Sequence, residues 1–481
     1  MKKQIGLGLA GLVLLTGCGV KILSTDEKTG ITSAAIEKIT TASDEKVTLN
    51  IVDWSDSTKE ARKQLNQRFE KDHPNVIINY TTLTQAQFNE TMLSGIRSGK
   101  APDLFPLPNN TDFQTAVSEG WFVPLNIYLD EDFFQQLKPE ALQQNITQQN
   151  DDIYLLPEAQ EISSTLMFYN RKLLTADELQ LVTSDEVTWQ QFREICQRVT
   201  KEEKGSAYGI ITSGAQKNRV DLELRAFSEL AGAPLGPEEQ IFVQQGKTLY
   251  ASEAVRQAFD WYQNLMTDGS FYPDSASLTA PEARNLFAEG KAAFIVQGSW
   301  CIPEWESQNS QLDFGVMPLP VPETSEDARQ IRPFTKGWMG ISATSKHPDV
   351  AAEYLKYLYS HKYQNQLVQS GGFVSIRSDL TESDISNERM QTYYRLAEAQ
   401  SRPMINPVTR DDDLHLVYSI IQPVQPDFGD IAAGLLTGEP DYFSRLKRYN
   451  DQVQLNLELA VDTVAKNLSV TLADFEVDDN D

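Results

Sequence analysis

The sequence predicts an α/β protein in which strands alternate with helices, and three observations lead to this prediction. From residue 47 onwards, β-rich runs alternate with amphipathic helical patterns, which is typical of βαβ units with a parallel sheet. The chain has 481 residues, enough for two or three domains with sizeable cores. With 40% hydrophobic residues and a mean hydropathy of −0.39, its composition is typical of a soluble globular protein.

The first elements follow one another in a regular order. VTLNIVDW, residues 47–54, predicts a β-strand. The next helix begins at a capping box, residues 57–60, and ends at His73–Pro74, and its apolar residues recur four positions apart. NVIINY at 75–80 and DLFPL at 103–107 predict two further strands, with a second helical pattern between them.

Polar and aromatic side chains follow two of these strands. In open α/β sheets, ligands bind beyond the carboxyl ends of the strands. This rule selects Asp53, Trp54 and Asp56 after the first strand, and Asn109 and Asn110 after the third. The alternative for Asp53 or Asp56 is that it only caps the following helix.

The first 19 residues, MKKQIGLGLAGLVLLTGCG, have the pattern of an exported lipoprotein. Two lysines precede an apolar run that is too short to span a membrane, and small residues follow. The embedded GLGLAG fits a dinucleotide-binding pattern, but the five residues before it leave no room for the required strand. Residues 15–18 resemble the bacterial lipobox, whose cysteine, here Cys18, becomes the lipid-modified first residue of the mature protein.

We therefore expect a signal peptide at residues 1–17, followed by a lipidated cysteine and a flexible tether at residues 18–46. The tether contains no aromatic residue and has a mean reach of about 25–30 Å. A doubly acylated cysteine would give a stable anchor, which predicts attachment to the cell membrane on its extracytoplasmic face. The alternative is a plain cleaved signal with an incidental cysteine.

Charge, cysteines and histidines exclude several classes of site. The net charge of −26 argues against nucleic acid or anionic lipid as a partner. Cys196 lies in a helical pattern and Cys301 just after a strand, so we expect both to be small buried hydrophobes rather than a disulfide. The four histidines have no metal-ligand spacing, and we expect neither a metal nor a cofactor.

A series of segments along the chain resembles the extracellular solute-binding proteins of ABC importers, and among them the carbohydrate-binding group. Each segment alone is a weak signal, but their order and spacing cover nearly the whole mature chain. The segments are FEKDHPNVIINY, SGKAPDLF, SEGWFVPLNIYL, YLLPEAQEISSTLMFYNRKLL, VTWQQFREICQRVT, LFAEGKAAFIVQGSW, FGVMPLPVPE, GWMGISATSKHPDVAAEYLKYLYS and LLTGEPDYFSRLKRYN.

The resemblance implies a two-lobed, periplasmic-binding-protein-like fold with the ligand held between the lobes. Each lobe would be a mostly parallel sheet flanked by helices, with a hinge where the chain crosses between lobes. The first lobe would comprise residues 47–158 and 299–335, and the second residues 163–296 and 340–481. The Pro-Leu-Pro of residues 106–108 stands where the family has an aromatic residue, which leaves the identity of the sugar open.

A sugar site needs flat aromatic side chains for the apolar face of the ring and polar groups for its hydroxyls. Trp54 follows the first strand, Trp300 matches a tryptophan that stacks on sugar in the family, and Trp338 lies at a predicted crossing. The other four tryptophans are expected in the core: Trp121, Trp189, Trp261 and Trp305. The predicted polar ligand residues are Asp53, Asp56, Asn109, Asn110, Glu158 and Glu161, with Tyr418 as a candidate from the second lobe.

These observations predict a monomeric, membrane-anchored lipoprotein that captures a carbohydrate and delivers it to ABC permease subunits. One alternative keeps the fold but binds a polyamine or another small polar ligand. The other is a secreted glycoside-acting enzyme, because Asp53 and Asp56 are near enough in sequence to form a carboxylate pair. No catalytic motif accompanies that pair, so we expect the protein not to be an enzyme.

Overall fold

The structure is a computed structural model. The predicted signal peptide, Cys18 and almost the whole tether lie outside the described residues, as do Asp56, Asn109 and Asn110. Within the described part of the chain, no helix is long and apolar enough to cross a membrane. The described residues are 46–54, 58–108, 111–161, 165–184, 186–237, 240–323, 328–331, 337–371, 373–402, 404, 406–411 and 413–477.

The first sheet is mostly parallel and confirms the three strands predicted near the start of the folded part. β1 pairs in parallel with β2, so that Val47 faces Val76, and it pairs in parallel with β3 on its other side. A late segment, β14, adds an antiparallel edge next to β3. The strand order is β14 (Met339–Ile341), β3 (Leu104–Pro106), β1 (Val47–Asp53) and β2 (Val76–Thr82).

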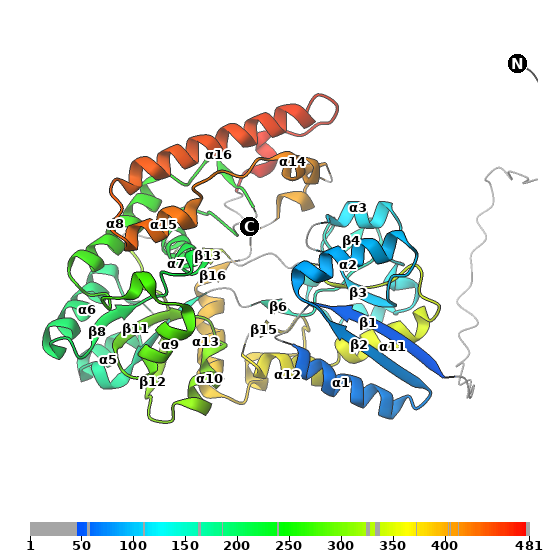
Figure 1. The fold of residues 1–481 in the computed structure, drawn as a ribbon, viewed down its shortest axis with the longest axis horizontal. Coiled ribbons are helices and arrows are strands. Elements are labelled where there is room, and N and C mark those ends of the chain that lie inside the picture. The colour runs from blue at the N-terminus through cyan, green and yellow to red at the C-terminus, as the bar shows by residue number, and fades with distance from the viewer. Residues whose placement is uncertain are drawn as a thin grey trace, which may run out of the picture. The chain divides into compact units, whose positions relative to one another are not determined.

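Helices α1 (Lys59–Asp72) and α2 (Gln85–Arg97) connect these strands, as the patterns predicted. α1 ends at His73, whose backbone N–H donates to the Phe69 carbonyl. α11 (Pro348–Leu358) and α12 (His361–Gln369) contact α1 beside the first sheet (Figure 1). We call these elements, which share one hydrophobic core, the first lobe.

The second sheet differs from the expected mostly parallel arrangement. β7 runs antiparallel to both of its neighbours, β11 and β12, and only β11 and β8 are parallel. All five residues of β7 are buried, and a continuous apolar strand of this kind does not reveal its direction. The strand order is β12 (Phe314–Met317), β7 (Leu166–Asn170), β11 (Ala292–Gln297) and β8 (Tyr208–Ile211).

Helices cover this second sheet and form with it what we call the second lobe (Figure 1). Trp189 and Trp261 stack in its core with ring centroids 5.0 Å apart, and Trp305 is buried near Phe168, which confirms their predicted core roles. Trp121 is buried in the first lobe, as expected. The helices are α5 (Ala176–Val182), α6 (Trp189–Glu203), α7 (Lys217–Leu230), α8 (Glu253–Thr267), α9 (Ala280–Ala288), α10 (Cys301–Gln308), α13 (Glu388–Ala399), α15 (Phe428–Leu436) and α16 (Tyr442–Val464).

The structure corrects the expected lobe boundaries. Residues 299–335 were expected in the first lobe, but β12 pairs with β7 and α10 packs in the second core. The start of 340–481 was expected in the second lobe, but β14, α11 and α12 belong to the first core. These assignments depend on pairing between segments far apart in the chain, which local patterns do not report.

Short elements complete the described chain. Cys196 and Cys301 are both buried, as predicted. The short strands pair as β4 (Gln148–Gln149) with β5 (Asp152–Ile153), β6 (Gln160–Glu161) with β15 (Phe373–Val374), β9 (Val243–Gln244) with β10 (Lys247–Thr248), and β13 (Gln330–Ile331) with β16 (Ser401–Arg402). The remaining helices are α3 (Phe113–Ser118), α4 (Glu131–Phe134) and α14 (Leu414–Ile420).

Helix α7 is buried along most of its length although it carries several charged residues. Glu223 is one of them, and its carboxylate accepts hydrogen bonds from Thr212 Oγ1 at 2.7 Å and from the Tyr262 hydroxyl at 2.9 Å. Burial raises the pKa of Glu223 to about 7, although the two hydrogen bonds oppose the shift. The folded protein therefore holds a proton on Glu223 at pH values where the unfolded chain has lost it.

Substituting Glu223→Gln should reduce the pH dependence of stability. Because the folded pKa is raised, the contribution of Glu223 is complete below its ordinary pKa and is lost as the pH rises through about 7. The wild-type free energy of unfolding should therefore fall by about 3 kcal/mol more than that of the variant between about pH 5 and about pH 8. Urea unfolding at both pH values measures this difference, with the exposed Glu289→Gln as the control. Equal pH dependence in all three proteins would contradict the assignment.

Candidate ligand-binding site

A buried arginine organises the carboxyl end of the first strand. Arg62 lies on the inward face of α1 with Leu65 and Phe69 and is fully buried. Its Nη2 lies 2.5 Å from Glu158 Oε1, and its Nη1 lies 3.6 Å from Asp53 Oδ2. Two predicted ligand residues, Asp53 and Glu158, are therefore brought together, but around a cation of the protein itself.

Two tyrosine hydroxyl groups add hydrogen bonds to this ion cluster. The Tyr363 hydroxyl accepts from Arg62 Nε at 3.2 Å and donates to Glu158 Oε1 at 3.0 Å. The Tyr80 hydroxyl donates to Asp53 Oδ2 at 3.0 Å. These bonds offset part of the cost of burying the charges, although Arg62 Nη1 is buried without a hydrogen-bond partner among the described residues.

Aromatic rings enclose the guanidinium group. The Arg62 Cζ atom lies 5.0 Å from the centre of the Trp338 ring and 5.8 Å from that of Tyr363. Burial alone would lower the pKa of Arg62, but Tyr363 and Glu158 oppose it, and the net pKa is raised. Arg62 therefore remains a cation in the folded protein, and it faces the negative π-face of the indole.

Three predicted ligand residues thus have a different place from the one expected. Asp53 has no exposed area, Glu158 is buried, and Trp338 packs in the first core against Arg62. In this structure the two carboxylates bind Arg62, and none of the three side chains is presented to solvent. The pairing of Arg62 with these carboxylates was not predicted from the sequence. The signal was its position three residues before Leu65 and seven before Phe69, which places it on the apolar stripe of α1.

Trp54 follows β1 directly and is half-buried. It packs against both hydrophobic clusters of the first lobe. Its indole N–H is buried and has no hydrogen-bond partner among the residues that the structure describes. A buried, unpaired N–H is unfavourable, so the Trp54 N–H is available to donate to a ligand. It lies just beyond the carboxyl end of β1, where a ligand was predicted.

Trp300 lies just beyond β11, at the start of α10, and 37% of its surface is exposed. It is the most exposed of the seven tryptophans, all of which the structure describes. Its ring lies over Gly298, where any Cβ atom would collide with the indole. Arg219, at the start of α7, places its Cζ atom 5.6 Å from the centre of the same ring. Sequence reasoning also missed Arg219, because no periodic pattern marks it.

The remaining predicted residues are less informative. The backbone of Glu161 belongs to β6, which pairs with β15. Tyr418 lies in α14 and packs against Phe475, with ring centroids 5.6 Å apart, and burial raises its pKa. Tyr418 is partly buried beside these apolar side chains, and its contact with a ligand stays a prediction. Asp56, Asn109 and Asn110 lie outside the described residues.

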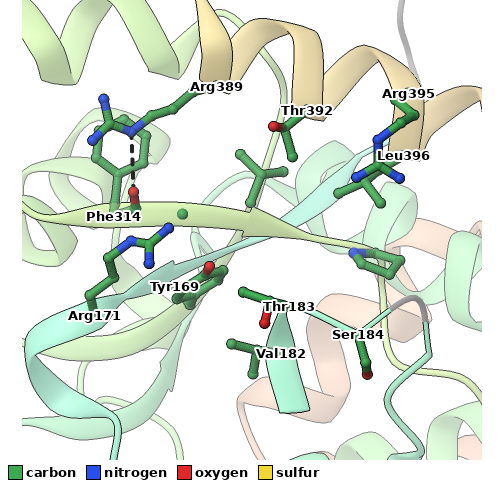
Figure 2. A pocket seen from close by; sticks show the side chains of 13 residues that line it. Tyr169, Arg171, Val182, Thr183, Ser184, Phe314, Arg389, Thr392, Arg395 and Leu396 are labelled. Atoms are coloured by element: carbon green, nitrogen blue, oxygen red, sulfur yellow. Dashed lines mark hydrogen bonds between the residues drawn. The ribbon is translucent and has the colours of Figure 1, made fainter. Parts of the chain in front are cut away.

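A cavity of about 240 Å³ lies in the second lobe between β7, β12 and α13 (Figure 2). Arg389 donates from Nε to the Phe314 carbonyl at 3.1 Å and lies over the Phe314 ring. None of the predicted ligand residues lines this cavity. The lining residues are Tyr169, Arg171, Val182, Thr183, Ser184, Phe314, Gly315, Val316, Pro318, Arg389, Thr392, Arg395 and Leu396.

Comparison of the sequence with protein families gives a match over most of the folded part. The family described as bacterial extracellular solute-binding protein matches residues 54–365. The multiple sugar-binding protein of Streptococcus mutans is 23% identical over 365 residues, 74% of this chain and 78% of that protein. The galactooligosaccharide-binding protein of Bacillus subtilis is 25% identical over 320 residues, 65% of this chain and 69% of that protein.

Solved structures show the same fold at lower sequence identity. The maltose/maltodextrin-binding domain from Bdellovibrio bacteriovorus, bound to maltotriose, superposes with a TM-score of 0.59 and 19% identity. The match covers 86% of this chain and all of that one. The two-lobed α/β architecture predicted from the sequence is thereby confirmed, apart from the strand directions and boundaries corrected above.

Replacing Arg62 should strongly destabilise the protein. Arg62→Met leaves two buried carboxylates without their cation, and breaking a buried pair in this way costs about 3–5 kcal/mol. Denaturant unfolding near neutral pH measures the loss. Lys63→Met on the same helix is the matched control, because the Lys63 side chain is 53% exposed and its loss should change stability by no more than about 0.5 kcal/mol. An Arg62→Met loss below about 1 kcal/mol would show that the cluster does not hold the first lobe together.

Proposed function

This chain belongs to the bacterial extracellular solute-binding protein family, and from that premise we propose that it captures a carbohydrate outside the cytoplasm and delivers it to an ABC permease. Two relatives in the comparison bind sugars by name, and a structural neighbour holds maltotriose. These relatives are binding proteins rather than enzymes. We accordingly propose that the sugar is bound and released without chemical change.

The exposed indole of Trp300 is the observation that supports this proposal most directly. Trp300 is the most exposed of the seven tryptophans, with 37% of its surface open, and it offers a flat apolar surface beyond the end of β11. The apolar C–H face of a pyranose fits such a plate, and the ring hydroxyls then project sideways to polar groups. Trp300 follows β11, whose carboxyl end is where α/β sheets bind ligands.

Trp54 and the neighbouring polar residues would supply the first-lobe part of the site. The buried N–H of Trp54 has no partner among the described residues and would donate to a sugar hydroxyl. Asp56, Asn109, Asn110 and Glu161 remain the proposed polar contacts. Asp53, Glu158 and Trp338 take an indirect role in this proposal, since with Arg62 they hold the end of β1 against α1.

Capture would work by a population shift between open and closed arrangements of the two lobes. A sugar that contacts both lobes favours the closed arrangement by its differential affinity for the two states. The chain passes between the two lobes before β7 and again before β14, and these two crossings would act as the hinge. The permease would then recognise the closed, loaded form.

Anchoring is the second part of the proposal. The lipobox-like residues 15–18 would be processed after a signal peptide, which leaves Cys18 acylated and the protein tethered to the outer face of the cell membrane. A monomer on a tether of this kind needs no other membrane contact.

Trp300→Ala should weaken sugar binding by about tenfold or more, because an aromatic stacking surface contributes on the order of 1–2 kcal/mol. Calorimetric titration with maltotriose, raffinose and galactooligosaccharides tests this expectation. Phe443→Ala is the matched control, since Phe443 is also 37% exposed but lies on α16. If Trp300→Ala and Phe443→Ala both bind sugar as the wild type does, Trp300 is not part of the site. If the wild type binds no saccharide, the proposed function is wrong.

Cys18→Ser should release the protein from the membrane fraction. The serine hydroxyl offers no thiol for lipid transfer, so the exported chain would lose its anchor. Fractionation of cells expressing each form, followed by immunoblotting, measures the distribution. A Cys18→Ser protein that stays in the membranes after signal cleavage would contradict lipid anchoring.

A further inference from the structure

Arg219 is a buried cation next to the exposed indole of Trp300. It lies in the first turn of α7, and only 9% of its surface is exposed. Its Cζ atom lies 5.6 Å from the centre of the Trp300 ring. The guanidinium group therefore lies next to the indole on which the proposed sugar would stack.

Arg219 differs from the other buried arginines in having no carboxylate partner. Among the described residues four arginines are buried, and three of them bind a carboxylate: Arg62 binds Glu158, Arg225 binds Asp221, and Arg377 binds Asp379. No carboxylate oxygen of a described residue lies within 4.0 Å of an Arg219 nitrogen. A buried charge without a counter-ion is unfavourable unless something else supplies one.

The hydrogen bonds of Arg219 are also incomplete. Its Nη2 donates to Gln297 Oε1 at 3.4 Å, which is a long hydrogen bond. Its Nε is buried without a hydrogen-bond partner in the part of the chain that the structure describes. For comparison, Arg225 on the same helix donates from Nε and Nη2 to both oxygens of Asp221, at 2.9 and 3.2 Å. Arg219 has the donors for such a fork, but no described carboxylate accepts from them.

Glu223, one helical turn further along, does not fill that role. One of its oxygens accepts from Thr212 and the other from Tyr262. Burial also raises the pKa of Glu223 to about 7, so that near neutral pH it carries only part of a negative charge. The cation–π contact between Arg219 and Trp300 does not satisfy the N–H groups of the guanidinium either. Such a contact uses the charge of the group and leaves its in-plane N–H donors without an acceptor.

We propose that Arg219 binds the anionic group of an acidic saccharide whose ring stacks on Trp300. A guanidinium group binds a planar carboxylate through two parallel hydrogen bonds, and a sulfate ester offers equivalent oxygens. The chain as a whole carries a net charge of −26 and repels anions, so an acidic sugar needs a local cation whose charge is not already neutralised. Arg219 meets this condition. The inference rests on the proposed sugar-binding function and narrows its substrate class.

The test compares saccharides that differ only in charge. Calorimetry measures the affinity of the wild type for trigalacturonate against galactotriose, for glucuronate trisaccharides against their glucose counterparts, and for a sulfated galactose oligosaccharide. We expect at least one acidic sugar to bind about tenfold more tightly than its neutral counterpart. The difference should shrink when the salt concentration is raised from about 50 mM to about 500 mM. The uronate and sulfate arms identify which anionic group is recognised.

Two variants locate the effect. Arg219→Met should abolish the advantage of the acidic sugar and leave affinity for the neutral one within about threefold. Lys217→Met is the matched control, because Lys217 is an exposed cation on the same helix that binds Asp427 and Asp430 instead. It should retain the acidic preference. Thermal unfolding of each variant checks that it is folded, and the wild-type comparison stands even if Arg219→Met does not fold.

Three results would overturn the inference. Equal or tighter binding of the neutral sugar in every pair would leave the sugar-binding function intact and remove the acidic specificity. An equal loss of acidic and neutral affinity in Arg219→Met would show that Arg219 acts only by supporting Trp300. Failure of every saccharide to bind the wild type would instead reject the proposed function, and the inference with it.

Discussion

The rest of the first lobe depends on one buried interaction, the contact of Arg62 with Glu158, Asp53 and Tyr363. These residues come from α1, the loop after β5, the end of β1 and α12, and the Arg62–Tyr363 hydrogen bond joins positions 301 residues apart. If Arg62 moved away, two buried carboxylates would lose their counter-ion, and an unpaired charge in a water-free interior is unfavourable. The edge of the first sheet is therefore set by charge pairing as much as by its hydrophobic core.

The two lobes use their charged groups differently at the ends of their strands. In the first lobe the carboxylates of Asp53 and Glu158 turn inward to Arg62 and are neutralised there. In the second lobe no carboxylate within the described ranges pairs with Arg219, which lies beside the exposed ring of Trp300. This difference gives the second lobe both the open aromatic surface and the unpaired charge, so ligand chemistry is expected to depend more on that lobe.

Local patterns were sufficient for the first five elements of the folded part. The apolar spacing of α1 and the β-rich runs of β1, β2 and β3 depend only on neighbouring residues, and the structure confirms them. The predicted capping box is not confirmed, because Thr58 at the start of α1 makes no side-chain capping hydrogen bond and Ser57 lies outside the described residues. The burial of Trp189 and Trp261 followed equally from helical position. The direction of β7 and the lobe of β14 depend instead on partners more than 100 residues away, which no local pattern encodes.

The candidate site could be predicted only in part, for a related reason. Trp300 was selected by its match to a tryptophan of the family, and the structure leaves 37% of its surface exposed, while its contact with a sugar stays a prediction. Position after a strand selected Asp53 without revealing that a helix residue nine positions later neutralises it. A carboxylate at a sheet edge has the same sequence pattern whether it meets a ligand or an arginine. The sequence feature that distinguishes the two cases here is Arg62, a charged residue on the apolar stripe of the next helix.

The most direct test of this account is a crystal structure of the protein with a bound saccharide. We expect the sugar ring to lie against Trp300 while Asp53 and Glu158 remain on Arg62 and make no contact with the sugar. The account would be contradicted if either carboxylate left Arg62 to accept a sugar hydroxyl, or if the indole of Trp300 stayed uncovered in the complex.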